Sequence, residues 1–166
     1  YQGCILIADE LKADSKNAIA ALKGAGVEKT VMLTGDNKNI GDAVAAELGI
    51  REKVVFHGSQ SNVYPFLHNA DVFLLPSRFE GMPMTIIEAM GTGLPVVATR
   101  VGGIPDMLDD DSALLVPVDV DAIADAFEKY YCDEALRQAR GLTAAKYAVR
   151  FSARVMAENY LKIYSA

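Results

Sequence analysis

The side chains most able to bind a ligand or take part in a reaction lie in one short run around two carboxylates, Glu80 and Glu88. The run also contains a hydroxyl, a guanidinium, a glycine and two methionines: Ser77, Arg78, Gly81, Met82 and Met84. An apolar segment precedes the run and a helical pattern follows it, so we expect these residues between a strand and a helix. Glu80 stands before the helix and Glu88 on it, which predicts two carboxylates at different depths along one ligand path.

Pro83 predicts where that helix begins. A proline fits the first turn of a helix, since a missing N–H is harmless there. The free backbone amides of residues 84–86 would then point back towards the loop, which predicts an anion site. Glu88 is expected to share a helix face with Met84 and Gly91.

The elements that must position these residues follow one another from Val72 to Gly103. We expect a strand, a loop, a helix, a second strand and a glycine loop: Val72–Leu75, Pro76–Met82, Pro83–Gly91, Pro95–Ala98 and Val101–Gly103. Both strands are short continuous apolar runs, which a parallel sheet covered on both faces requires. Ligands of such sheets bind outside the carboxyl ends of the strands, so the functional edge is predicted at these loops.

The run from Glu80 to Glu88, EGMPMTIIE, resembles the Glu-x7-Glu motif of retaining glycosyltransferases with the two-domain GT-B architecture, in particular the large family four. ADVFLLPS before it, and EAMGTGLPVVAT and VGGIPDML after it, agree with that family. From about residue 51 to the C-terminus the chain is similar to the domain of these enzymes that binds the nucleotide-sugar donor.

The resemblance implies a role for each matching residue. Glu88 would hold the ribose hydroxyls, and Glu80 would lie near the donor sugar. Gly81–Met84 would approach the sugar and the phosphates, and the loop at Gly58–Gln60 would border the base. The candidate ligand is a nucleoside diphosphate sugar, with no cofactor and no metal. Each residue also has a purely structural alternative: an exposed helix carboxylate for Glu88, a charge favoured by the helix dipole for Glu80, and a turn for Gly58.

Composition narrows the classes of protein. The chain has 166 residues, 51% of them hydrophobic, and a net charge of −6, which suits a single domain and argues against nucleic-acid binding. No apolar run approaches membrane-spanning length. Cys4 and Cys132 lack metal-ligand or disulfide spacing, so we expect thiols of a soluble protein in the reducing cytoplasm. His57 and His68 stand alone, which predicts no metal site, and no required protein partner is evident.

Six apolar runs predict six strands: Gly3–Ala8, Thr30–Leu33, Val54–Phe56, Val72–Leu75, Pro95–Ala98 and Ala113–Val116. Helices are expected at about Lys16–Lys23, Asn39–Leu48, Asn62–Asn69, Pro83–Gly91, Ile104–Leu108, Asp121–Tyr131, Glu134–Val149, with Gly141 as a weak point, and Ser152–Tyr164. This alternation predicts an α/β fold: a doubly wound, six-stranded parallel sheet of three layers, Rossmann-like, with strand order 3-2-1-4-5-6. That order puts Asp9–Asp14 opposite Pro76–Met82, across one crevice.

The first fifty residues resemble a different family. DSKNAIAALKGAGVEKTVMLTGDN, which includes Thr34-Gly35-Asp36, is similar to the phosphorylation domain of heavy-metal P-type ATPases of the haloacid-dehalogenase superfamily. A junction would fall between about residues 35 and 52. We therefore expect a hybrid, natural or engineered, that joins residues 1–50 and 51–166 in one domain. The alternative is a divergent glycosyltransferase domain.

Neither half keeps the full chemistry of its family. The ATPase motifs DKTGT and GDGxND are absent, so phosphoryl transfer lacks its nucleophile and its Mg²⁺ clamp. The transferases neutralise the diphosphate with an arginine and a lysine after the first strand, where this chain offers only Lys12 among the carboxylates of Asp9, Glu10 and Asp14. Without an acceptor domain, we expect a nucleotide-sugar-binding domain that is not an active enzyme alone. The alternatives are a hybrid without a ligand and a transferase subunit that needs a partner chain.

Overall fold

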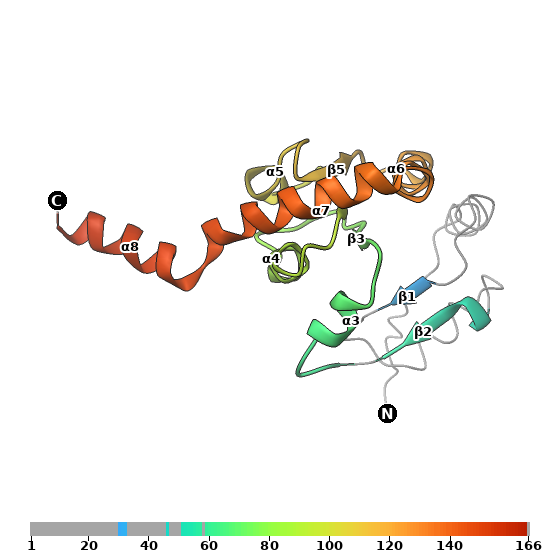
Figure 1. Ribbon diagram of the computed structural model, residues 1–166, viewed down its shortest axis with the longest axis horizontal. Helices are drawn as coiled ribbons and strands as arrows, with labels where there is room; N and C mark the ends of the chain where they lie inside the picture. The colour runs from blue at the N-terminus through green and yellow to red at the C-terminus, as the bar shows by residue number, and fades with distance from the viewer. Residues whose placement is uncertain (1–29, 33–45, 47–50, 58, 166) are drawn as a thin grey trace, which may run out of the picture. The chain divides into compact units, whose positions relative to one another are not determined.

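The computed structural model describes residues 30–32, 46, 51–57 and 59–165 (Figure 1). The chain divides into two compact units, Tyr1–Ser59 and Gln60–Ala166. The expectation of one domain over the whole chain stays a prediction.

The first unit contains a parallel strand pair. β1 (Thr30–Met32) pairs with β2 (Val54–Phe56), and a 3-10 turn, η1 (Arg51–Lys53), leads into β2. This confirms that the second and third predicted strands are parallel neighbours. The first predicted strand, the helix expected at 16–23 and all but residue 46 of the helix expected at 39–48 lie outside the described residues.

The second unit contains a three-stranded parallel sheet in the order β3-β4-β5. β3 (Phe73–Leu75) pairs with β4 (Val96–Thr99), and β4 pairs with β5 (Ala113–Val116). This confirms the predicted order of the last three strands. The complete six-strand order stays a prediction, because the described strands form two separate sheets.

The described residues of the second unit, 60–165, contain seven helical segments, of which the first precedes β3. Their bounds are α3 (Tyr64–His68), α4 (Met84–Gly91), α5 (Ile104–Met107), α6 (Val120–Cys132), α7 (Glu134–Ala148), η2 (Val149–Phe151) and α8 (Ala153–Tyr164). Side chains cap three of them at the N-terminus: Asp119 for α6, Asp133 for α7 and Ser152 for α8. Each cap satisfies a backbone amide that the helix leaves free, which is why these helices begin where the sequence predicts.

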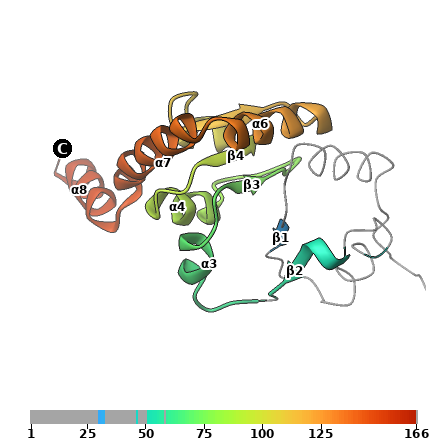
Figure 2. The ribbon, with the colours of Figure 1, turned by 45° about the vertical axis from the view of Figure 1, so that its right-hand side comes forward.

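β4 is buried along its whole length, with side chains packed on both faces. The larger core cluster includes Ile86, Met90, Val96, Ala98 and Ala144, from α4, β4 and α7. The second cluster contains Val97, Ala126 and Tyr130, from β4 and α6. Because alternate β4 residues enter different clusters, helices cover both faces of this sheet, as predicted (Figure 2). Burial raises the pKa of Tyr130 to about 12, so its phenol stays neutral at physiological pH.

Gly141 corrects one expectation. It was predicted as a weak point of its helix, yet α7 runs unbroken through it. A Cβ atom at Gly141 would lie 2.2 Å from the carbonyl oxygen of Gly93, in the turn that ends α4. Glycine therefore allows α7 to lie directly against this turn. The packing contact outweighs the low helix propensity of the residue.

Candidate functional site

The loop between β3 and α4 holds Glu80 through hydrogen bonds. The Ser77 hydroxyl donates to Oε1 of Glu80 at 2.6 Å. The hydroxyl of Thr99, the fully buried last residue of β4, donates in turn to the backbone carbonyl of Ser77 at 2.5 Å. Two strands thus orient the Glu80 carboxylate at the carboxyl edge of the sheet, where the sequence predicts the ligand.

The glycine loop after β4 lies against the same segment. Gly102 has a φ of +51°, and a Cβ there would come within 1.8 Å of the Glu80 carbonyl oxygen. The Gly103 amide donates to that oxygen at 3.3 Å, and a Cβ at Gly103 would lie 2.3 Å from the carbonyl oxygen of Gly81. The loops after β3 and β4 are therefore in direct backbone contact, which only glycines permit.

The start of α4 differs from the prediction by one residue. Pro83 is the N-cap, with φ −69° and ψ 113°, rather than a residue of the first turn. Its carbonyl accepts a hydrogen bond from the Ile86 amide at 3.2 Å, so that amide is not free as predicted. Among the described residues, the amides of Met84 and Thr85 have no backbone acceptor. The extended conformation of Pro83 explains the shift, because its carbonyl already begins the hydrogen-bond ladder of the helix.

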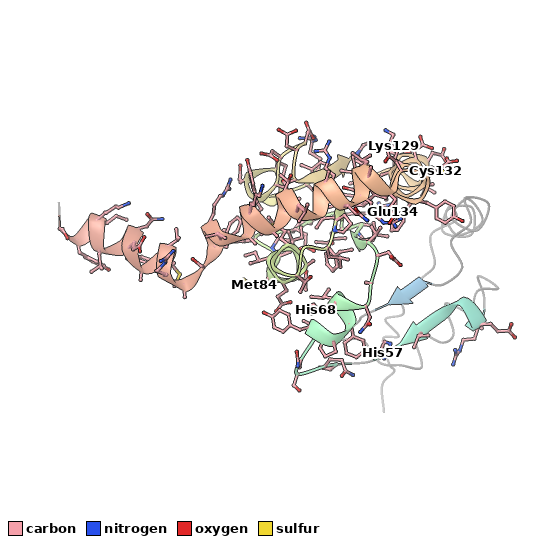
Figure 3. All side chains as sticks on the ribbon, viewed as in Figure 1. His57, His68, Met84, Lys129, Cys132 and Glu134 are labelled. Atoms are coloured by element: carbon pink, nitrogen blue, oxygen red, sulfur yellow. The ribbon has the colours of Figure 1, made fainter. Side chains whose placement is uncertain are left out.

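The accessible face of α4 carries the second carboxylate. Met84 is 61% exposed (Figure 3). Glu88 is half-buried and Gly91 is exposed. This confirms the predicted shared face, since the three positions lie on one side of the helix while Ile86 and Met90 enter the core. The loop adds exposed apolar side chains at Phe79 and Met82. Carboxylates, free amides and apolar surface can together bind a polar ligand that has a flat or apolar part.

Two candidate residues, Lys12 and Gly58, lie outside the described residues. The predicted crevice between Asp9–Asp14 and Pro76–Met82 therefore stays a prediction. Within the described ranges, no group of three or more His, Cys, Asp and Glu residues has metal-binding geometry. His68 instead contacts its own helix, with Nδ1 2.8 Å from the Tyr64 carbonyl oxygen. The described helices include none with the length and hydropathy of a membrane span.

Thr99 is the site residue that the sequence analysis missed. The sequence feature that could have indicated its role is a single hydroxyl at the end of the apolar run Val96–Thr99. Arg100 follows it and forms an ion pair with Asp110 at 2.6 Å. This guanidinium is therefore engaged with the turn before β5.

Comparison with known proteins places these features in a family. The family model of the glycosyl transferases group 1 matches residues 15–133. The lipopolysaccharide core biosynthesis mannosyltransferase LpsB of Rhizobium meliloti is 32% identical over 124 residues, which are 69% of this chain and 35% of that protein. The chain thus spans about a third of the length of this relative.

A solved structure and a second relative add to the comparison. The Anabaena protein HepE, in complex with UDP and glucose, aligns with a TM-score of 0.73 at 20% identity, over 88% of this chain and 44% of that one. The likeness supports a GT-B type, Rossmann-like α/β fold. The zinc-transporting ATPase of Synechocystis is 56% identical over 50 residues, 30% of this chain and 7% of that protein. Because the family model covers most of the chain, the protein belongs to the glycosyl transferases group 1 family.

Proposed function

We propose that the chain is a nucleotide-sugar-binding domain whose site runs from Ser77 to Glu88. One observation carries this proposal. The Ser77–Glu80 hydrogen bond and the backbone contact with Gly102 hold the loop in place, while Glu88 stays accessible on α4. A site held by two strands before a ligand arrives loses less entropy on binding.

The accessible groups suggest how a nucleoside diphosphate sugar would bind. Glu88 accepts hydrogen bonds from the ribose hydroxyls, and the amides of Met84 and Thr85 face the diphosphate. Glu80 lies near the donor sugar. The naming of LpsB as a mannosyltransferase and the UDP and glucose bound to HepE support this class of ligand.

We further propose that residues 1–166 by themselves do not transfer sugar. Residues 9–14, which the sequence predicts as a loop, include Lys12 and no arginine, and their three carboxylates disfavour a diphosphate. Departure of the diphosphate then lacks the charge neutralisation that the reaction needs. The chain also spans 35% of LpsB.

The origin of residues 1–50 is a separate proposal. A hybrid is supported by the 56% identity to the zinc-transporting ATPase over 50 residues. The family model, however, begins at residue 15, inside the segment that resembles the ATPase, which favours the divergent transferase domain. Comparison of residues 1–50 and 51–166 separately decides between the two, because a natural full-length relative similar over both segments would rule out the hybrid.

Calorimetric titration of the whole chain with UDP, GDP and ADP tests the binding proposal. We expect saturable binding of at least one nucleotide. The Glu88→Ala variant should weaken it by about tenfold or more, since hydrogen bonds to a charged group contribute roughly 1.5–3 kcal/mol. The matched control is Glu128→Ala, which removes an exposed carboxylate from α6 and should leave the affinity unchanged.

Two results would count against this function. Absence of heat with every nucleotide, from a protein that melts cooperatively, would support the hybrid without a ligand. Equal affinity of wild type and Glu88→Ala would place the nucleotide away from α4. Activity assays with sugar donors on the same preparation test the second proposal, and any transfer by residues 1–166 alone would overturn it.

A further inference from the structure

A cavity of about 350 Å³ lies between β5, α6 and α7, away from the loop and helix of the candidate nucleotide site. Its apolar wall consists of β5 and two alanines of α6, Ala122 and Ala126. Its polar lining consists of Asp110, Asp125, Lys129 and Arg140. A volume in this range, a mostly apolar wall and a few polar groups are typical of sites for small molecules.

Arg140 has an unsatisfied donor at this cavity. Its Nη1 atom is buried and makes no hydrogen bond within the described part of the chain. The carboxylate oxygen Oδ1 of Asp111 lies 3.8 Å from it, which is too far for a hydrogen bond. A buried guanidinium nitrogen without an acceptor is unfavourable, and an oxyanion in the cavity would supply the acceptor.

The two cations at the cavity differ in their partners, since Arg140 lies within ion-pair distance of Asp111, at 3.8 Å. Asp110 is already paired with Arg100 at 2.6 Å. Lys129, which projects from α6, has no ion pair among the described residues (Figure 3). Asp125 lies one helical turn before Lys129, about 6 Å along the axis. The negative charge of Asp125 lies towards Ala122, so the ammonium of Lys129 is the cation at this cavity with which an anion can pair.

We propose that this cavity binds a small organic anion, a carboxylate or a phosphate monoester. Its oxyanion pairs with the ammonium of Lys129, and a rotation of the Arg140 side chain brings the unsatisfied Nη1 donor to it. Its carbon skeleton lies against Ala122 and Ala126. This site is independent of the nucleotide site, because none of the residues from Ser77 to Glu88 contributes to its wall.

Thermal melting of the whole chain tests the proposal, with inorganic phosphate and acetate as separate probes and sodium chloride at matched ionic strength as the reference. Binding to the folded state raises the melting temperature saturably with ligand concentration. We expect such a rise with at least one probe. A rise with phosphate alone identifies the ligand as a phosphate monoester, and a rise with acetate alone identifies it as a carboxylate.

Variants assign the rise to the cavity. Arg140→Gln should weaken the apparent affinity by about tenfold or more, because a charge-assisted hydrogen bond is lost. Ala122→Leu should also weaken it, since it fills the cavity without a change of charge. The control Arg154→Gln removes an exposed guanidinium of α8, whose side chain is 80% exposed, and should keep the full effect.

Two outcomes overturn the proposal. One is the absence of a saturable rise with either probe. The other is a rise that Arg140→Gln and Ala122→Leu leave unchanged, because the anion then binds elsewhere, for example at the free amides of α4. If Arg140→Gln does not fold, Lys129→Ala replaces it, because this lysine is exposed. An unchanged affinity in this variant also contradicts the proposal.

Discussion

The hydroxyl of Tyr147, near the end of α7, donates a hydrogen bond to Oδ2 of Asp109, in the turn before β5. The guanidinium of Arg150 lies 4.6 Å from the centre of the same tyrosine ring. The hydrogen bond from Tyr147 lowers the pKa of Asp109 below its ordinary value of 3.8, and the hydrogen bond to Asp109 raises the pKa of Tyr147 above 10.0. The hydrogen bond between the helix and the turn before β5 is therefore strongest while Asp109 is ionised and Tyr147 is neutral.

The pH dependence of stability follows from these two shifts. The lowered pKa of Asp109 contributes stability that is present above pH 3.8 and is lost as the pH falls through the folded value. The raised pKa of Tyr147 contributes stability that is present below pH 10.0 and is lost as the pH rises through its folded value. Tyr147→Phe should therefore lower the free energy of unfolding between these limits and flatten its pH dependence at both ends. Urea unfolding from acid to alkaline pH measures this.

The control for that series is Tyr160→Phe, which removes a hydroxyl from an exposed position of α8. It should leave both the stability and its pH dependence unchanged. An identical pH profile for wild type and Tyr147→Phe would show that the hydrogen bond does not contribute to folding.

Gly102→Ala should be strongly destabilising. The residue has a φ of +51°, and its new Cβ would lie 1.8 Å from the Glu80 carbonyl oxygen. The left-handed conformation alone costs an alanine roughly 1–2 kcal/mol, and the clash adds to this because the neighbouring atom is backbone. Thermal unfolding measures the loss. The control Gly91→Ala, with no atom within 4 Å of its Cβ, should be neutral or stabilising by about 0.5–1 kcal/mol. Equal effects of the two changes would contradict the close approach of the loops.

Thr99→Val should loosen the β3–α4 loop and weaken nucleotide binding. The change keeps the shape of the buried side chain but removes the hydroxyl that donates to the Ser77 carbonyl. We expect a loss of about 1–3 kcal/mol in the free energy of unfolding, because the carbonyl loses a buried partner. The control is Thr143→Val on α7, where the hydroxyl bonds only to its own helix in an exposed position. Chemical denaturation and nucleotide titration should show little change for that control.

Gly141→Ala sets two effects against each other. Helix propensity favours alanine by roughly 0.5–1 kcal/mol in the interior of α7. The contact with Gly93 opposes it, since the Cβ would lie 2.2 Å from a backbone oxygen. We expect the contact to dominate, with a net loss of about 1–3 kcal/mol from overpacking. A stabilised variant in thermal unfolding would show that α7 does not lie against this turn.

Features encoded by neighbouring residues could be predicted from the sequence. The capped helices α6, α7 and α8 begin within one residue of the predicted positions, because Asp119, Asp133 and Ser152 act on amides three residues away. The last three strands and their order also agree with the prediction, because continuous apolar runs joined by short helices allow few parallel arrangements. The shared face of Met84 and Glu88 follows from helical periodicity alone.

The tertiary structure decided what depends on residues far apart in the chain. From the sequence, Gly141 predicts a weak point in its helix, whereas in the structure it allows the close contact with Gly93. Thr99 is only the last residue of an apolar run in the sequence, but its hydroxyl donates to the carbonyl of Ser77, 22 positions earlier. The unsatisfied Arg140 nitrogen has the same origin, because burial and the distance to Asp111 are set by packing. Local sequence determines which hydrogen bonds and faces a segment can form by itself. Close approaches and buried partners arise only when separate segments pack together.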